Sequence, residues 1–193
     1  EHGDMKNPHN ITKDFEAALC EYTGAPYAVA VTSCTMALLL AVAWHLRGRP
    51  ASATTEVVTP GGHHAMAWDN SRTIEIPKRT YISVPMSIIH AGGQPTFRDE
   101  EWRGGYQLKP LQVWDSARWF TSGMYRLGPS SGMNRPTDVT RFDRVLPKGA
   151  MVCLSFHASK TLGDTQGGAI LHDNPEADKW LRRARFDGRT EGV

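Results

Sequence analysis

One lysine in this chain lies between an apolar segment and a pair of glycines, a position that suits covalent chemistry. Lys160 follows the mostly apolar residues 151–156, and Gly167 and Gly168 come shortly after it. At the end of a buried strand an ammonium group loses hydration, so the neutral amine becomes accessible as a nucleophile. The glycine pair allows close backbone approach at the start of the next apolar segment. Because a lone lysine after a strand is usually a surface lysine, further groups are needed before chemistry is inferred.

A second feature is the run Ser33-Cys34-Thr35, which joins the β-prone residues 27–31 to the apolar residues 36–46. The first N–H groups of a helix have no partner within it and lie at the positive end of its dipole, so such a turn can bind a phosphate. A plain N-cap is the more common role for these residue types. Ser155, just before the Lys160 segment, would add another hydroxyl.

The third feature is Asp115, which ends the apolar stretch 112–114. A carboxylate there needs a cationic partner or hydrogen bonds. A protonated pyridine nitrogen would be such a partner, and the carboxylate would keep that ring electron-poor. Alternatively, Asp115 caps a turn with Ser116 or pairs with Arg118. A nucleophilic lysine, a phosphate turn and a buried carboxylate together point to pyridoxal phosphate (PLP), whose aldehyde would react with Lys160.

The elements that must position these residues alternate between strands and helices. Strands are predicted over 27–31, 55–59, 73–76, 95–97, 112–114, 151–155 and 168–172. Helices are predicted over 36–46, 81–90 and 174–186, and another has Thr12 as its N-cap and stops at 24–26. Residues 121–149 are rich in Gly, Pro, Ser and Arg and predict a long loop. This order predicts one α/β domain over 1–193, with a mostly parallel sheet flanked by helices.

Composition excludes several other classes of protein. Hydrophobic residues make up 40% and charged residues 22%, and the net charge of +2 forms no basic stripe, so no nucleic-acid partner is expected. The longest apolar run, 36–44, is too short to span a membrane. The doublet His63-His64 lacks a spaced carboxylate or thiolate partner, so no metal site is predicted. Three cysteines without a CxxC spacing indicate a reducing, cytoplasmic location.

Four segments resemble the DegT/StrS family of PLP-dependent sugar aminotransferases, in a shortened form. FEAALCEYTGAPYAVAVTSCTMALLLAV, residues 15–42, resembles the family's first helix, strand and "SGTAAL" phosphate turn. RTYISVPMSIIHAGGQPTFRD, residues 79–99, resembles "TYVST…GA.PVFVD", and VWDSARWFTSGMY, residues 113–125, resembles "IEDAAQA.G..Y". LSFHASKTLGDTQGGAILHDN, residues 154–174, resembles "FSFHASKN…GEGGAIVTDD" and is the most specific of the four. The resemblance implies the large domain of a fold-type-I PLP-dependent transferase.

The resemblance also implies roles for three residues around the cofactor ring. Lys160 would hold PLP as a Schiff base and move the proton between the substrate carbon and the cofactor. Asp115 would pair with the pyridinium nitrogen. Tyr81 would stack on the ring, although burial alone could also explain an aromatic there.

Four further residues would hold the rest of the cofactor. The backbone N–H of Cys34 and the side chains of Thr35 and Ser155 would bind the phosphate. Arg118 matches a position where the family usually has Gln or His, near the phenolic oxygen of the ring. An arginine there could donate to that oxygen, and its fixed charge would change the protonation of the lysine–cofactor bond.

The function implied is transfer of an amino group from a glutamate-like donor to a keto substrate, typically a nucleotide-linked keto sugar, by a homodimer with active sites near its interface. Lysine at position 160 disfavours the family's dehydratase branch, in which histidine replaces it. Family members are about twice as long, so the resemblance implies a shortened form: we expect a βα unit to be absent between Tyr106 and Leu111 and the C-terminal small domain to be absent after Val193. The alternatives are a reduced, non-catalytic homologue that binds PLP or pairs with another subunit, and another PLP reaction such as decarboxylation or elimination.

Overall fold

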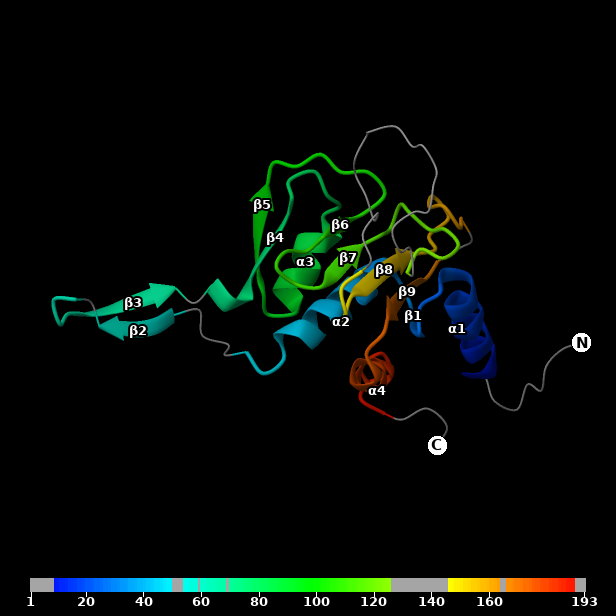
Figure 1. Ribbon diagram of the computed structural model, residues 1–193, viewed down its shortest axis with the longest axis horizontal. Helices are drawn as coiled ribbons and strands as arrows, with labels where there is room; N and C mark the ends of the chain where they lie inside the picture. The colour runs from blue at the N-terminus through cyan, green and yellow to red at the C-terminus, as the bar shows by residue number, and fades with distance from the viewer. Residues whose placement is uncertain are drawn as a thin grey trace, which may run out of the picture.

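A five-stranded sheet forms the centre of the protein, seen in a computed structural model that describes residues 9–49, 54–58, 60–68, 70–125, 146–163 and 166–189 (Figure 1). Its strands, in spatial order, are β1 (Tyr27–Val31), β9 (Gly168–His172), β8 (Met151–Ser155), β7 (Val113–Asp115) and β6 (Tyr106–Gln107). β7 and β8 are parallel, whereas β9 is antiparallel to both of its neighbours and β6 is antiparallel to β7. The α/β class is therefore confirmed, but the sheet is mixed and not mostly parallel.

A second pair of strands continues beyond β6. β4 (Thr73–Pro77) and β5 (Gln94–Arg98) are parallel to each other, as expected for a βαβ unit. An isolated antiparallel bridge joins β4 to the segment after β6, with the N–H of Glu75 donating to the carbonyl of Lys109 at 2.7 Å and the reverse bond at 3.0 Å. The strand β6 was not predicted. It lies in the region where the sequence indicated a missing βα unit, and it fills the space between β7 and β4.

Within the described residues four helices accompany the strands, and all four have bounds that differ from the prediction. They are α1 (His9–Thr23), α2 (Cys34–Leu46), α3 (Ser83–His90) and α4 (Pro175–Ala184). Thr12 lies inside α1 and not at its N-cap, because the helix begins three residues earlier. Gly24 ends α1 as predicted, with a φ of 76° that favours glycine. α2 begins two residues earlier than expected, α3 begins two residues later, and α4 begins one residue later and ends two residues earlier.

The core lies on both faces of the sheet, as the alternating side chains of β8 show. Met151 and Cys153 pack in one apolar cluster with the buried residues of α2 and α4. Val152 and Leu154 pack in a second cluster with Leu19 of α1. Alternation places successive strand residues on opposite faces, so α2 and α4 cover one face and α1 the other. None of the described helices combines the length and the apolar character needed to cross a membrane.

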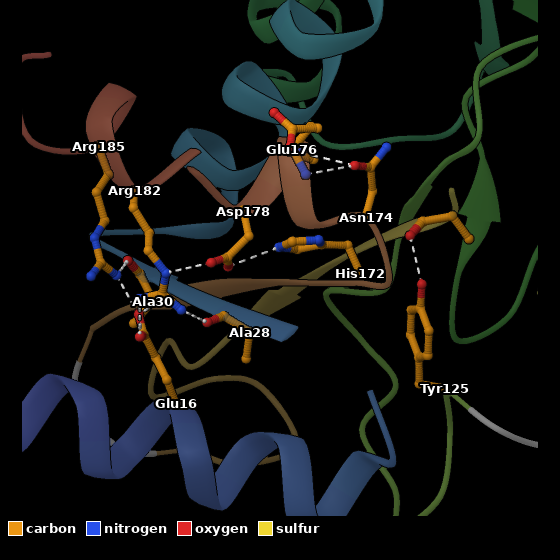
Figure 2. Close-up of polar contacts among 12 residues, drawn as sticks. Glu16, Ala28, Ala30, Tyr125, His172, Asn174, Glu176, Asp178, Arg182 and Arg185 are labelled. Atoms are coloured by element: carbon orange, nitrogen blue, oxygen red, sulfur yellow. Dashed lines mark hydrogen bonds and ion pairs between the residues drawn. The ribbon is translucent and has the colours of Figure 1, made fainter. Parts of the chain in front are cut away.

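A buried carboxylate fixes α1 and α4 to β1 (Figure 2). Glu16 of α1 is 4% exposed and accepts hydrogen bonds from the N–H of Ala30, at 2.8 Å, and from the guanidinium of Arg182, at 2.6 Å. Arg185 forms a further ion pair with the same carboxylate. Because both arginines also donate to carbonyls of β1, this cluster holds the strand that leads into the Ser33 turn.

A hairpin lies apart from the rest of the fold in Figure 1. It consists of β2 (Thr54–Val58) and β3 (His64–Trp68), with a turn at 60–62 as predicted, and the 3-10 helix Asn70–Arg72 follows it. β2 begins one residue before the predicted strand, whose last residue lies outside the described residues, and β3 was not predicted. Residues 126–145 of the predicted long loop also lie outside the described residues.

Candidate active site

A cavity of about 400 Å³ lies where α2 begins and where β7 and β8 end. In α/β sheets the carboxyl ends of strands that run the same way meet at one edge, and ligands bind there. Six of the seven residues predicted for the site line this cavity: Cys34, Thr35, Tyr81, Asp115, Ser155 and Lys160. The structure therefore brings together residues that lie up to 126 positions apart in the chain.

The start of α2 forms one wall of the cavity. Ser33 has extended backbone angles and is the N-cap, and its hydroxyl accepts the N–H of Met36 at 3.1 Å. This bond satisfies one of the N–H groups that a helix start leaves without an intrahelical partner. Cys34 and Thr35 follow at the positive end of the helix dipole and line the cavity. The N-cap role and the anion-binding geometry are thus both present in the same turn.

The glycine at the start of β9 allows this turn to approach the sheet. A Cβ atom at Gly168 would lie 2.5 Å from the carbonyl carbon of Ser33 and 2.6 Å from the backbone nitrogen of Cys34. Both contacts are with backbone, which cannot move aside as a flexible side chain could. The absence of a side chain at position 168 therefore allows the start of α2 to lie close to the strand ends.

Asp115 is the buried acidic group of the cavity, with 6% of its surface exposed. One carboxylate oxygen accepts the N–H of Ala117 at 3.0 Å and lies 4.0 Å from the thiol sulfur of Cys34, which donates to it. The other oxygen accepts the hydroxyl of Tyr106 at 2.8 Å. Burial raises the pKa of Asp115, and the two hydrogen bonds and the charge of Lys160 oppose that rise.

Lys160 lies on a short turn that follows β8. Its N–H donates to the carbonyl of His157 at 2.8 Å, and the His157 ring in turn contacts Ser159, with Nδ1 accepting the Ser159 N–H at 3.2 Å. The Lys160 side chain is half-buried, so the deep burial expected at a strand end is not observed. Its charge nevertheless acts on both Asp115 and the thiol of Cys34.

Three further predicted residues occupy different positions relative to the cavity. Ser155 lines it and accepts the N–H of His157 at 3.5 Å, which leaves its hydroxyl proton as a donor. Tyr81 lies at the cavity edge and is 74% exposed. Arg118 is not among the described residues that line the cavity. Its side chain is exposed, and its carbonyl accepts the hydroxyl of Thr161 at 3.4 Å.

The sequence did not predict two features of the site. The thiol of Cys34 contacts Asp115, whereas only its backbone N–H was assigned a role. Tyr106 was not assigned to the site at all, although it lies directly opposite Asp115 in the ladder between β6 and β7. A hairpin predicted from the sequence, with its turn near Pro110, would have indicated this pairing. The segments on either side of the turn are too short for an alternating apolar and polar pattern to be recognised.

The fold and the site together define an α/β domain with a ligand cavity at its strand ends. The DegT/DnrJ/EryC1/StrS aminotransferase family matches residues 1–113, more than half of the chain. The protein therefore belongs to this family. The matched range includes the Ser33 turn and Tyr81 but ends before Asp115, Ser155 and Lys160, so for those residues the argument rests on geometry.

Solved structures with the same fold are sugar aminotransferases and related enzymes. A DegT DnrJ EryC1 StrS aminotransferase from Brucella abortus matches 97% of this chain and 52% of its own, with a TM-score of 0.59 and 17% identity. DesV from S. venezuelae, solved with a ketimine intermediate, matches 94% and 51% with a TM-score of 0.57 and 19% identity. The sugar aminotransferase CalS13 from Micromonospora echinospora matches 93% and 51%, with a TM-score of 0.57 and 16% identity. This chain thus spans about half the length of these structures.

The donor groups of the cavity fit pyridoxal phosphate. The start of α2, with Thr35, and the hydroxyl of Ser155 would suit a phosphate. The buried carboxylate of Asp115 would suit a protonated ring nitrogen, and Lys160 supplies an amine for the aldehyde. A cavity of about 400 Å³ is within the range of cofactor sites.

Proposed function

We propose that this chain binds pyridoxal phosphate and catalyses transamination. The observation that carries the proposal is that Asp115, Lys160 and the start of α2 face one cavity, although they come from three separate parts of the fold. Membership of an aminotransferase family supports the reaction class. Because the chain spans about half the length of its structural relatives, the activity rests on this site and not on the likeness alone.

Each group in the cavity would have one task. The amine of Lys160 would hold the cofactor through its aldehyde and would accept and return the proton at the substrate carbon. The carboxylate of Asp115 would pair with the ring nitrogen. The start of α2 and Ser155 hold the phosphate, and Tyr81 covers a face of the ring. When bound, PLP supplies the electron sink that the protein side chains lack.

The substrates we propose are a glutamate-like amino donor and a keto acceptor, in particular a nucleotide-linked keto sugar. The donor leaves as its keto acid while the acceptor gains the amine. The family and the sugar aminotransferases among the structural relatives support this substrate class. The three cysteines are free thiols, which is consistent with a reducing, cytoplasmic location.

A homodimer with active sites near its interface would complete the substrate pocket. Tyr81, Ile82, Met86 and Ile89 are exposed hydrophobic side chains on and just before α3, and Tyr81 lines the cavity. Apolar residues clustered beside an open site are a typical subunit contact. Arg118 stays a weaker candidate for the phenolic oxygen of the ring, because its side chain is exposed and not part of the described cavity wall.

The second candidate function is a non-catalytic PLP-binding or interaction subunit. The observation that favours it is that the likeness to the solved aminotransferases covers about half of their length. A PLP-binding subunit shares the cofactor with the transaminase and differs in whether an amino acid reacts with it, whereas an interaction subunit need not bind PLP.

Mixing the purified chain with PLP should produce a visible absorption band that free PLP lacks. Borohydride reduction followed by peptide mass spectrometry should place the cofactor on Lys160. Lys160→Ala should lose both signals, whereas Lys179→Ala, at an exposed lysine of α4, should keep them. An unchanged spectrum for the wild-type chain would rule out transamination and PLP binding, and would leave only the interaction subunit. Adding glutamate should then shift the band, and the absence of a shift with every amino acid tested would leave the non-catalytic function.

A further inference from the structure

Tyr106 and Asp115 form a buried pair beneath the candidate site. They are directly opposite residues in the antiparallel ladder of β6 and β7, and directly opposite side chains point to the same face of a sheet. The Tyr106 hydroxyl donates to a carboxylate oxygen of Asp115 at 2.8 Å, and the two residues are 5% and 6% exposed. The pairing is thus set by backbone register and not by a flexible surface contact.

Thr80 extends this pair into a chain of hydrogen bonds. Its hydroxyl contacts the Tyr106 hydroxyl. Because Tyr106 donates its only proton to Asp115, Thr80 must be the donor to Tyr106. Both protons therefore point toward the carboxylate, an arrangement in which each hydrogen bond strengthens the next. The other carboxylate oxygen receives the N–H of Ala117.

Apart from these hydrogen bonds, most of the surroundings of Asp115 disfavour its negative charge. The titratable groups that face it within the described residues are the thiols of Cys34 and Cys153, the hydroxyl of Tyr106 and the amine of Lys160. Of these, Lys160 alone carries a positive charge. Burial raises the pKa of Asp115, and the Tyr106 hydrogen bond acts in the opposite direction. A neutral acid at this position would lose its attraction for a ring cation.

We propose that Tyr106 is a positioning residue that keeps Asp115 ionised and directed toward the cavity. Tyr106 is not among the described cavity-lining residues, so it would act on a bound ligand through Asp115. The part concerning the cofactor rests on the proposed function, whereas the effect on Asp115 does not. β6 provides this support in the short connection between β5 and β7, where the sequence indicated a missing βα unit.

The test compares two tyrosine-to-phenylalanine substitutions that each remove one buried hydroxyl. Tyr106→Phe removes the donor to Asp115. Tyr125→Phe is the matched control, because the Tyr125 hydroxyl is similarly buried and donates at 2.8 Å to the carbonyl of Ala150, outside the cavity (Figure 2). Carboxyl ¹³C NMR of the ligand-free full chain gives the pKa of Asp115, and Asp115→Asn identifies its resonance.

Tyr106→Phe should raise the pKa of Asp115 by about one unit, the effect of removing one hydrogen bond to a charged group. PLP affinity measured by fluorescence titration should weaken about tenfold for the same reason. Thr80→Val should cause a smaller shift in the same direction. Tyr125→Phe should change neither quantity.

Several results would overturn the proposal. An unchanged Asp115 pKa in Tyr106→Phe, or an equal shift in Tyr125→Phe, would show that Tyr106 is only a packing residue. A shifted pKa with unchanged PLP affinity would reject the link to the cofactor. If the wild-type chain binds no PLP, the proposed function fails, and the NMR comparison in ligand-free protein still decides whether Tyr106 controls Asp115.

Discussion

Replacing Gly168 with alanine should disturb the start of α2 and with it the candidate phosphate site. The added Cβ would lie 2.5 Å from the carbonyl carbon of Ser33, whereas ordinary contact begins at 3.4 Å. The backbone of the turn must therefore move by about 0.9 Å. Overpacking of this kind costs about 1–3 kcal/mol, and we expect about 2–3 kcal/mol here because both close partners are backbone. A misplacement near 1 Å would also weaken PLP binding by about tenfold to a hundredfold.

Two measurements test this expectation. Urea unfolding followed by circular dichroism gives the free energy of unfolding, and fluorescence titration gives the affinity for PLP. Gly149→Ala is the control, since Gly149 has a φ of 82° but its added Cβ would meet nothing within 4 Å. It lies before β8, at the opposite end of that strand from the cavity. Its backbone strain should cost about 1–2 kcal/mol with unchanged PLP affinity.

The reasoning would be refuted by either of two outcomes. If the free energy of unfolding of Gly168→Ala lies within about 0.5 kcal/mol of the wild-type value, the backbone contact does not exist as described. If its stability falls but its PLP affinity equals that of Gly149→Ala, the start of α2 does not hold the cofactor phosphate.

Two further predictions concern stability. Glu16→Ala leaves Arg182 and Arg185 without their buried carboxylate and should lower the free energy of unfolding by about 3–5 kcal/mol. Lys179→Ala, which breaks an exposed ion pair, should cost less than about 0.5 kcal/mol, and a similar loss in both variants would contradict the buried network. Burial and two neighbouring arginines lower the pKa of His45 from 6.5 to about 4. The unfolded chain therefore binds the proton first, and stability should fall as the pH drops from about 6.5 to about 4, by at most about 3 kcal/mol. His45→Gln should remove this part of the pH dependence in urea unfolding, and an unaltered pH profile would show that His45 does not cause it.

The elements next to the chemistry could be predicted from sequence because their signals are local. β8 and β9 have the predicted bounds, since continuous apolar runs end there in glycine or polar residues. The last helix was predicted over 174–186, and Asn174 is instead its N-cap, whose side chain accepts the N–H groups of Glu176 and Ala177. α1 begins earlier than Thr12 because helix starts depend on contacts that a capping residue type does not determine.

Strand direction and pairing could not be predicted in the same way. The sequence of β9 is that of any buried strand and does not indicate its direction. β9 is antiparallel to both neighbours because a short connection from the end of β8 leads directly into it. β6 contains two residues, too few for a periodic pattern, and it is held by pairing with β7 and the bridge to β4. Pairing partners distant in sequence decide such elements.

The sequence by itself determined the chemistry available to this protein: a lysine after a strand, a carboxylate after another, and a hydroxyl-rich helix start, in motifs typical of one aminotransferase family. Residue types and short spacings are enough for that, because they set local backbone geometry and the functional groups present. Only the tertiary structure decided which groups meet. It placed Asp115, Lys160 and the start of α2 at one cavity, left Arg118 on the surface, and set Tyr106 against Asp115. Those outcomes depend on sheet order, strand register and the close packing that Gly168 allows, and these are properties of long-range contacts.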